Sequence, residues 1–500
     1  MTDFNPPLPL PLLPFPPPPA LADPTSQARL QFSSLEQWLS DAQTLALPLH
    51  CVEDQQEGKG RELQRLLLQA HVVQRGNGDL GPALQVTAPP APALYTHRRL
   101  QRRALKTIFG PIHIDRIGYG RQGVESIHPL DQAMQLPARS FSYELQKRLV
   151  KAALQGPFQE AIDRIQDMTG LLVPKRSLEE IVQEAAQDFD GFYGQRVPEP
   201  WQQTAPILVV AVDGKGIPLV RPNPAPRSIR PAKCPKPGGK KMATVAAVFT
   251  RAPWIRTPDQ VVQSLFRTTA ATKADPPAPR PEHKRVWASL VKSKADVIDD
   301  VFQEIIRRDP DSQKIRVALT DGERALQILV GKKLQVTLIL DLLHVLDRVW
   351  QAAHVFAPEG SPEAEIWARL ACSRILEGNV CQVIKGLRQT VTKRKLFGTK
   401  RATLLSVAGY FDNNQEHMRY DEYLAQGLPI ASGSVEGACK HLIKDRMERS
   451  GMRWTEPMAE AIVKLRAIYL SGDFDSYWLF HISRDQQRIY PTGRWTVVVK

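Results

Sequence analysis

Three carboxylates stand at positions where they could hold metal ions. The β-branched run ILVVAVDG is predicted to be a buried strand that ends at Asp213, and KIRVALTDG is predicted to be a second strand that ends at Asp321. A third carboxylate, Glu436, falls in the first turn of a helix predicted over 434–449, beside its apolar stripe. Three carboxylates from separate elements can bind two Mg²⁺ or Mn²⁺ ions about 4 Å apart. Such a site catalyses in-line attack at a phosphodiester.

Each carboxylate also has a simpler explanation. Asp213 and the glycine after it could form a hairpin turn. Asp321 could serve a helix start, because Thr320 and Glu323 have the spacing of a capping box. Glu436 could be placed by the helix dipole, which favours an acid in the first turn. None of these alternatives explains why basic tracts surround the elements that carry the acids.

The distribution of charge favours a polyanionic partner. The chain has 500 residues, a net charge of +14 and a pI near 9.5. Residues 214–256 contain ten basic residues and no acid, residues 383–401 contain seven and no acid, and a third basic cluster spans 98–106. We expect the first two tracts to contact DNA phosphates. The residues expected to do so are Lys215, Arg227, Arg230, Lys233, Lys236, Lys240, Lys241, Lys393, Arg394 and Lys395.

Cysteine usage and hydropathy indicate a cytoplasmic protein. The five cysteines are far apart in sequence and include no C-x-x-C pair, so neither a disulfide framework nor a cysteine zinc site is expected. No apolar run approaches the length of a membrane helix, and the proline-broken N-terminus does not resemble a signal peptide.

The first 200 residues divide into three predicted regions. Residues 1–25, rich in proline, are predicted to be a disordered arm. Residues 26–137 form an N-terminal region that contains helices and the third basic cluster. Residues 138–200 have the pattern of three helices, and the last two have the layout of a helix-turn-helix whose second helix begins with Lys175 and Arg176. A plain helical hairpin is the alternative.

The remaining chain predicts an α/β catalytic domain. Strands at 207–213, 216–220 and 242–250 are expected to form a three-stranded meander, a long polar excursion follows at 251–293, and alternating helices and strands come next. This is the pattern of a ribonuclease-H-like sheet. The expected bounds are 201–341 and 430–470 for this domain, 342–429 for an all-helical insertion and 471–500 for a C-terminal tail.

Four segments together resemble the insertion-sequence transposases of the Kra group, within the Mutator-like DDE superfamily. They are VDGKG, LTDGE, DLLHVLDRVWQAA and GSVEGACKHLIKDRMERSGMRW, and the resemblance covers about residues 95–470. It assigns the three metal-binding, catalytic acids to Asp213, Asp321 and Glu436, at intervals of 321 − 213 = 108 and 436 − 321 = 115 residues.

The same resemblance implies further residues and a function. An Asp-x-x-His signature falls on Asp341 and His344, with supporting or DNA-contacting roles expected for these two residues and for Arg348 and Trp350. The implied protein binds double-stranded DNA at the ends of its own element, cuts and joins it with two Mg²⁺ ions, and acts as a homo-oligomer on the bacterial nucleoid. Two other functions stay open: a non-catalytic DNA-binding regulator, and a nuclease of the same fold.

Overall fold

The computed structural model describes residues 23–86, 93–220, 239–266, 278–431, 433, 437, 440–490 and 495–497. The chain divides into two compact units, one made by residues 1–192 and 474–500 and the other by residues 193–473. We call them unit 1 and unit 2.

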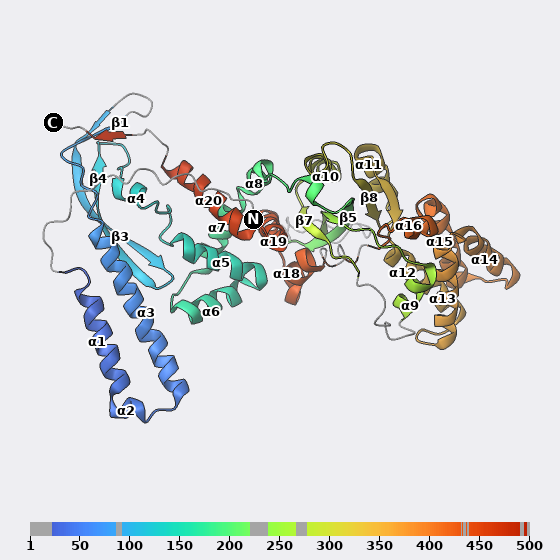
Figure 1. The fold of residues 1–500 in the computed structure, drawn as a ribbon, viewed down its shortest axis with the longest axis horizontal. Coiled ribbons are helices and arrows are strands. Elements are labelled where there is room, and N and C mark those ends of the chain that lie inside the picture. The colour runs from blue at the N-terminus through green and yellow to red at the C-terminus, as the bar shows by residue number, and fades with distance from the viewer. Residues whose placement is uncertain are drawn as a thin grey trace, which may run out of the picture. The chain divides into compact units, whose positions relative to one another are not determined.

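Unit 1 contains helices and two small sheets (Figure 1). The antiparallel pair of α1 (Ser26–Ser40) and α3 (Leu49–Gln74) is joined through α2 (Ala42–Leu45). A long hairpin of β3 (His97–Thr107) and β4 (Gly110–Gly120) packs against α3 and against α4 (Pro129–Ala133). β1 (Leu84–Val86) pairs with β2 (Ala93–Tyr95) on one side and with β10 (Trp495–Val497) on the other. Strands from both ends of the chain therefore share one sheet.

The three helices predicted in 138–200 are present. They are α5 (Tyr143–Gln155), α6 (Phe158–Thr169) and α7 (Lys175–Ala186), and each packs on the other two. α6 ends at Gly170, whose φ of 69° is the left-handed conformation that favours glycine at a helix C-terminus. α8 (Phe189–Gln195) contains the boundary between the units.

The C-terminal region contains a helix that the sequence analysis did not assign. α20 (Phe474–Ile489) lies within the segment described above as a tail. Its buried residues Phe474, Tyr477, Trp478 and His481 have helical spacing, and Tyr477 packs edge-on against Phe192 at 5.4 Å between ring centroids. This helix is therefore part of the core of unit 1.

Unit 2 is built on a five-stranded mixed sheet. Its strands are β5 (Ile207–Pro218), β6 (Lys240–Arg251), β7 (Glu282–Ser289), β8 (Ile315–Thr320) and β9 (Thr337–Leu340), in the order β7-β6-β5-β8-β9. β7, β6 and β5 run antiparallel in turn, whereas β5, β8 and β9 are parallel. This arrangement is compatible with the ribonuclease-H-like sheet expected from the sequence.

Helices pack against this sheet and connect its strands. α9 (Pro258–Phe266) precedes β7, α10 (Lys294–Arg308) packs on β6 and α11 (Arg324–Leu334) packs on β8. α19 (Glu456–Leu470) packs along β7. Ile207 to Val212 of β5 are all buried, as expected for a central strand covered on both faces.

Two strand predictions were wrong. The segment 216–220 is not a separate strand, because β5 continues through the Asp-Gly pair to Pro218 and stays paired with β6 along its whole length. The third antiparallel strand is not 216–220 but β7, which lies inside the predicted polar excursion.

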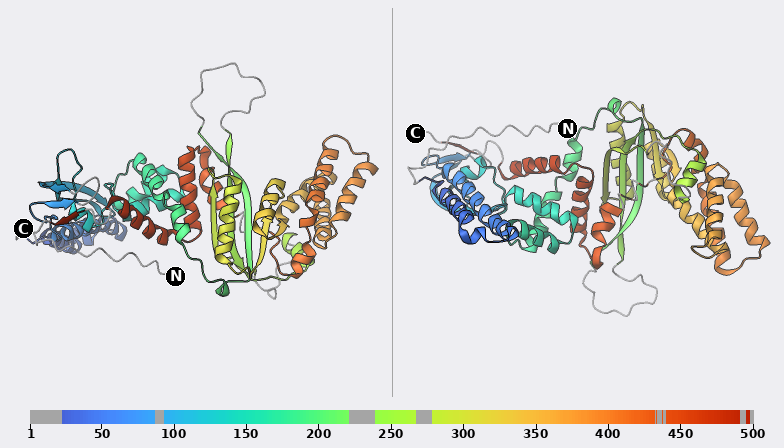
Figure 2. Two further views of the ribbon diagram at one scale, coloured as in Figure 1. Left: turned by 90° about the horizontal axis from the view of Figure 1, so that it is seen from above. Right: turned by 60° about the horizontal axis from the view of Figure 1, so that its bottom comes forward.

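A helical block follows β9, as predicted. It contains α12 (Leu342–Phe356), α13 (Pro362–Leu376), α14 (Val380–Lys393), α15 (Gly398–Asn414) and α16 (Tyr420–Ala425). Figures 1 and 2 show these helices gathered beyond the β8–β9 side of the sheet. The Leu342 N–H donates to the Ile430 carbonyl at 2.9 Å, which ties the end of the block to its start. Beyond it, Lys440–Lys444 form a π-helical turn that continues into α18 (Asp445–Met447).

Candidate active site

The strand register aligns three aspartates at one edge of the sheet. β5 and β8 pair in parallel with Ala211 opposite Leu319, so the same register extended by two residues sets Asp213 opposite Asp321. β8 and β9 pair with Thr320 opposite Leu340, and one further residue sets Asp321 opposite Asp341. Neighbouring strands are about 4.8 Å apart, and residues in register on parallel strands face the same side. The three carboxylates therefore come from adjacent strands.

Each aspartate accepts a hydrogen bond from the backbone that follows it. Asp213 Oδ1 accepts the Gly214 N–H at 2.7 Å. Asp321 Oδ1 accepts the Glu323 N–H at 2.9 Å, and Asp341 Oδ1 accepts the Leu343 N–H at 2.9 Å. Asp213 and Asp321 are half-buried, whereas Asp341 is 2% exposed. The first two carboxylates thus keep solvent access while their strands are buried.

The simpler explanations of Asp213 and Asp321 can be tested against the structure. Asp213 is not in a hairpin turn, since it lies within β5 opposite Val245 of β6. Asp321 accepts the N–H of Glu323, the residue just before α11, but no side chain caps that helix. The predicted capping box is absent: Thr320 Oγ1 instead accepts the Gln327 side-chain amide at 3.3 Å. The bond from Glu323 occupies one of the two carboxylate oxygens of Asp321.

Asp341 joins the sheet to the helical block. Its N–H donates to the Thr320 carbonyl at 2.9 Å, and its side chain caps α12. The N–H of the next residue, Leu342, donates to the carbonyl of Ile430 at the end of the helical block. Glu436 follows six residues after Ile430 (436 − 430 = 6) and lies outside the described residues.

Two helices of the block hold the turn that follows β8. The Tyr410 hydroxyl, from α15, donates to the Asp321 carbonyl at 2.8 Å. Arg348, from α12, lies over the Tyr410 ring at 4.9 Å and donates to Gln351 at 3.0 Å. Arg348 therefore supports Asp321 through Tyr410, a residue that the sequence analysis did not single out.

His344 and Trp350 lie along the same helix. His344 is half-buried in the first turn of α12. Trp350 is half-buried, with ring centroids 5.9 Å from Phe266 of α9 and 5.7 Å from His354. This indole packs between helices, which is the ordinary role of an aromatic residue at such a position.

The basic residues predicted to bind DNA fall into three groups. Arg227, Arg230, Lys233 and Lys236 lie outside the described residues. Several of the others form ion pairs: Lys240 with Glu448, Lys241 with Glu456 at 2.8 Å, Lys175 with Glu179 at 3.9 Å and Arg176 with Glu180 at 2.9 Å.

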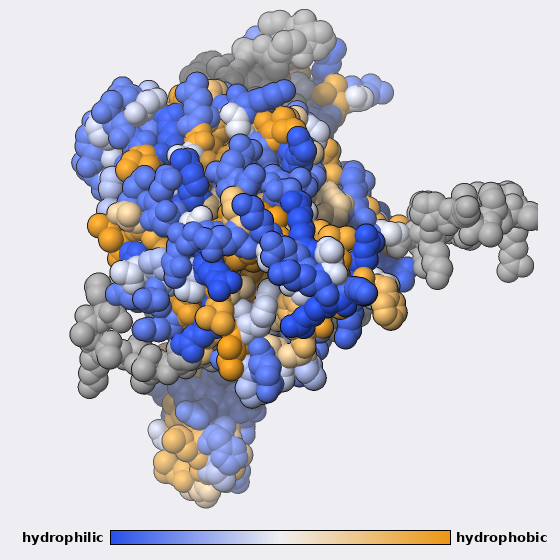
Figure 3. All heavy atoms as spheres, turned by 90° about the vertical axis from the view of Figure 1, so that its right-hand side faces the viewer, coloured by the Kyte–Doolittle hydropathy of each residue, from blue (hydrophilic) through white to orange (hydrophobic). Residues whose placement is uncertain are grey.

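The third group is not ion-paired among the described residues. Lys393, Arg394 and Lys395 are exposed where α14 ends, and the Arg394 guanidinium is 5.6 Å from the Phe356 ring. Lys215 is half-buried in β5, two residues from Asp213 and so on the same face of the strand. Figure 3 shows the side of unit 2 that carries α13 to α15, where hydrophilic side chains predominate and hydrophobic ones are scattered.

Two of the three residues predicted to bind a metal ion are described in the structure, and both have the ligand chemistry that Mg²⁺ prefers. Asp213 and Asp321 supply half-buried carboxylate oxygens, the ligand type that Mg²⁺ prefers. Within the described ranges, no group of three or more His, Cys, Asp or Glu residues is arranged to hold a metal ion. The expected third ligand, Glu436, lies outside those ranges, so the described part of the site has two of its three predicted ligands.

No helix in the described part of the chain has the length and apolar character needed to cross a membrane. No protein-family model matches the chain, and no curated protein matches it in sequence. Among solved structures, it is similar to a Drosophila P element transposase strand transfer complex, with a TM-score of 0.23 and 7% identity over 70% of this chain and 82% of that one. A TM-score this low supports no conclusion about this chain.

Proposed function

We propose that this chain is a DDE-type transposase, a polynucleotidyl transferase with a ribonuclease-H-like catalytic domain. The supporting observation is the parallel register of β5 and β8, which, extended by two residues past the Ala211–Leu319 pair, puts Asp213 within β5 level with Asp321 just after β8. Strand order β7-β6-β5-β8-β9 and the helical block after β9 agree with such a domain. Glu436 completes the proposed triad.

In this proposal the side chains bind and orient the ends of DNA. Asp213, Asp321 and Glu436 would hold two divalent cations, and these would supply Lewis-acid activation of a water or 3′-hydroxyl and charge stabilisation at the phosphate. Tyr410 and Arg348 fix the Asp321 turn, so that this carboxylate does not reorient during the reaction. Lys215 lies on the same face of β5 as Asp213 and offers a positive charge to a phosphate.

The partners of the proposed enzyme are the two ends of its element and a target duplex. The exposed basic residues at the end of α14 provide contacts to DNA phosphates that do not depend on sequence. α6 and α7 are proposed as the helix-turn-helix that reads the ends. Joining two ends calls for an oligomer, and a homodimer or larger assembly is part of the proposal.

The first experiment compares Mg²⁺-dependent cleavage and joining of DNA that carries the element's ends. We expect the wild type to cut and join, and Asp213→Asn, Asp321→Asn and Glu436→Gln to bind the ends while losing at least about 10³-fold of the rate. Asp299→Asn is the matched control, because Asp299 is exposed on α10 and pairs with Lys333. It should cut at the wild-type rate.

The alternatives give different results in the same assay. A DNA-binding regulator would bind the ends and never cut them. A nuclease of the same fold would cut without preference for the ends and would not join them. Full activity in both Asp213→Asn and Asp321→Asn would show that the aligned aspartates are not catalytic.

A further inference from the structure

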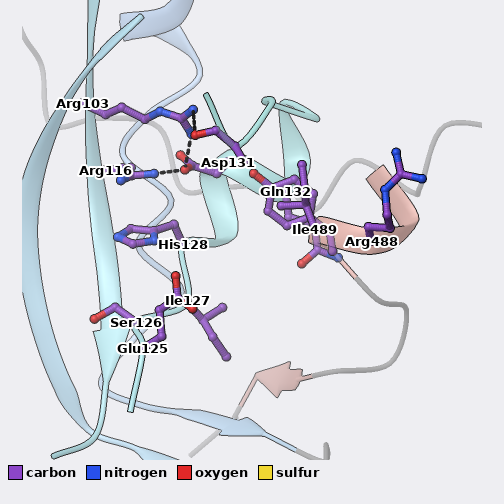
Figure 4. Close-up of a pocket in the computed structure, with 12 residues that line it drawn as sticks. Arg103, Arg116, Glu125, Ser126, Ile127, His128, Asp131, Gln132, Arg488 and Ile489 are labelled. Atoms are coloured by element: carbon purple, nitrogen blue, oxygen red, sulfur yellow. Dashed lines mark hydrogen bonds and ion pairs between the residues drawn. The ribbon is translucent and has the colours of Figure 1, made fainter. Parts of the chain in front are cut away.

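A half-buried cavity in unit 1 is lined by three arginines and two carboxylates. It measures about 510 Å³ and lies between the β3–β4 hairpin, α4 and the end of α20. Figure 4 shows Arg103 and Arg116 converging on the Asp131 carboxylate, with His128 beside Arg116. None of these residues belongs to the candidate active site, which is in unit 2.

Arg103 has several hydrogen-bond acceptors within the fold, whereas the Asp131 carboxylate is contacted by two arginines. Arg103 donates to Asp131 Oδ2 at 2.9 Å, to the Arg139 carbonyl at 2.9 Å and to the Pro137 carbonyl. These bonds hold the chain after α4, so Arg103 has a structural role. Asp131 is 3% exposed, and its Oδ2 also accepts the ion pair from Arg116. One carboxylate is therefore shared by two guanidinium groups.

Arg116 has a buried donor that the fold does not satisfy. Its side chain is 15% exposed, and its contact with Asp131 goes through a single nitrogen, Nη1. Its Nε is buried and has no hydrogen-bond partner among the described residues. A guanidinium carries five N–H donors in a fork that suits phosphate and carboxylate. Arg116 is thus a poorly satisfied cation on the wall of a cavity.

The other groups on the cavity wall that can carry a charge are Arg488, His128 and Glu125. Arg488 is held by Asp188 at 2.8 and 3.0 Å, which neutralises it. His128 contacts Gln101 Oε1 at 2.8 Å through Nε2. Burial and the charges of Arg116 and Arg103 lower the His128 pKa to about 4, so this ring is neutral at pH 7. Glu125 is exposed. The balance of Arg103, Arg116 and Asp131 is one excess positive charge.

We propose that this cavity binds a phosphate group, carried by a nucleotide or by a strand of DNA, with Arg116 as its anchor. A phosphate oxygen would pair with the open side of the guanidinium and neutralise the excess charge. The volume is much larger than a phosphate ion and lies in the range of small-molecule sites, so the attached nucleoside has room.

The melting temperature of the protein without phosphate distinguishes a phosphate-binding role of Arg116 from a role in stabilising the fold. Burial and the neighbouring charge of Arg103 lower the Arg116 pKa to about 10, so folding disfavours the charged form of this side chain. Arg116→Gln removes a charge that is poorly compensated, while Arg103 still pairs with Asp131. We expect its melting temperature to equal or exceed that of the wild type when no phosphate is present.

The binding test uses the full chain with three probes: inorganic phosphate, deoxyadenosine monophosphate and a 12-nucleotide single strand. Affinity is measured by calorimetry and by the rise in melting temperature. Arg116→Gln should bind about 10-fold more weakly or worse, and Arg116→Lys should fall in between because it keeps the charge and loses the fork. Arg99→Gln, at an exposed position of the same hairpin, should bind as the wild type does.

The probes also identify the source of the phosphate. Binding of the mononucleotide identifies a nucleotide site, and binding of the strand alone identifies a site for the DNA backbone. Equal affinity in Arg116→Gln and the wild type, failure of all three probes to bind, or a large fall in the melting temperature of both Arg116 variants would overturn the proposal. Asp213→Asn should keep this binding, so failure of the proposed enzyme activity would leave this result unaffected.

Discussion

Gly322 shows how a single backbone position fixes the candidate active site. It follows Asp321 with a φ of 89°, a conformation that glycine adopts readily and other residues do not. An added Cβ would lie 2.9 Å from the Tyr410 ring and 3.1 Å from a Leu340 methyl. The Asp-Gly pair after β8 is therefore required by the turn and by the close approach of α15.

Gly322→Ala should lower the free energy of unfolding by about 1–3 kcal/mol, since it adds both backbone strain and a clash with Tyr410. Urea unfolding measures this change. Gly386→Ala is the control: this glycine lies inside α14 with no atom near the added Cβ, so the same substitution should raise stability by about 0.5–1 kcal/mol. If Gly322→Ala were as stable as the wild type, the described turn would be wrong.

At the scale of elements, a buried ion-pair network joins β7 to α10. Glu304 accepts hydrogen bonds from Arg308 Nε at 2.7 Å and from Arg285 Nη1. The Arg285 guanidinium also lies 3.7 Å from the Tyr193 ring. Burial acts to raise the Glu304 pKa, but the two guanidinium groups outweigh it and lower the pKa from 4.5 to about 2. This pairing allows Arg285 to be buried in a strand.

The lowered pKa predicts a specific acid sensitivity. The ionised Glu304 stabilises the fold at pH values above 4.5, and this contribution is lost as the pH falls from about 4.5 to about 2. Glu304→Gln should cost about 3 kcal/mol at pH 7, because it leaves two guanidinium groups without a carboxylate. The difference from the wild type should shrink as the pH approaches 2. Denaturant titrations between pH 7 and 2 measure it, with Glu359→Gln, at an exposed site, as the control. A pH-independent difference would contradict this role.

The same network explains why β7 was not predicted from the sequence. β7 begins Glu-His-Lys-Arg, which has no strand signal, and Arg285 becomes a core residue only because Glu304 neutralises it from another element. The Asp213-Gly214 pair suggested a turn, whereas pairing with β6 continues the strand through it. By contrast, the spacing of Phe474, Tyr477, Trp478 and His481 was visible in the sequence and could have predicted α20.

The candidate site was predictable to the extent that its residues follow from local pattern. Two β-branched runs predicted the strands that carry Asp213 and Asp321; β8 ends just before Asp321 as expected, whereas β5 continues past Asp213 to Pro218. Tyr410 is 89 residues from the carbonyl it holds, and Arg116 meets Asp131 across two elements. No periodicity or motif encodes such contacts, because each joins elements that are far apart in the sequence and meet only within the folded unit.

At the scale of the whole molecule, the net charge alone does not indicate which basic residues are available to bind DNA. The chain carries +14, yet Lys240 and Lys241 are paired with Glu448 and Glu456. Lys393 and Lys395 are exposed at the end of α14 and form no ion pair among the described residues. Two acid-free tracts of similar appearance in sequence therefore differ in the charge they offer to a phosphate.

This difference predicts unequal salt dependence. The double variant Lys393→Gln/Lys395→Gln should weaken DNA binding and reduce the slope of log K against log salt by about 2, roughly one for each lost phosphate contact. Lys240→Gln/Lys241→Gln should reduce the slope by less, since each substitution removes a charge that an acid already neutralises. Fluorescence anisotropy of a labelled duplex at several KCl concentrations gives both slopes. Equal reductions in the two double variants would show that local ion pairing does not decide which lysines meet DNA, and an unchanged slope in the first would remove α14 from the DNA-binding surface.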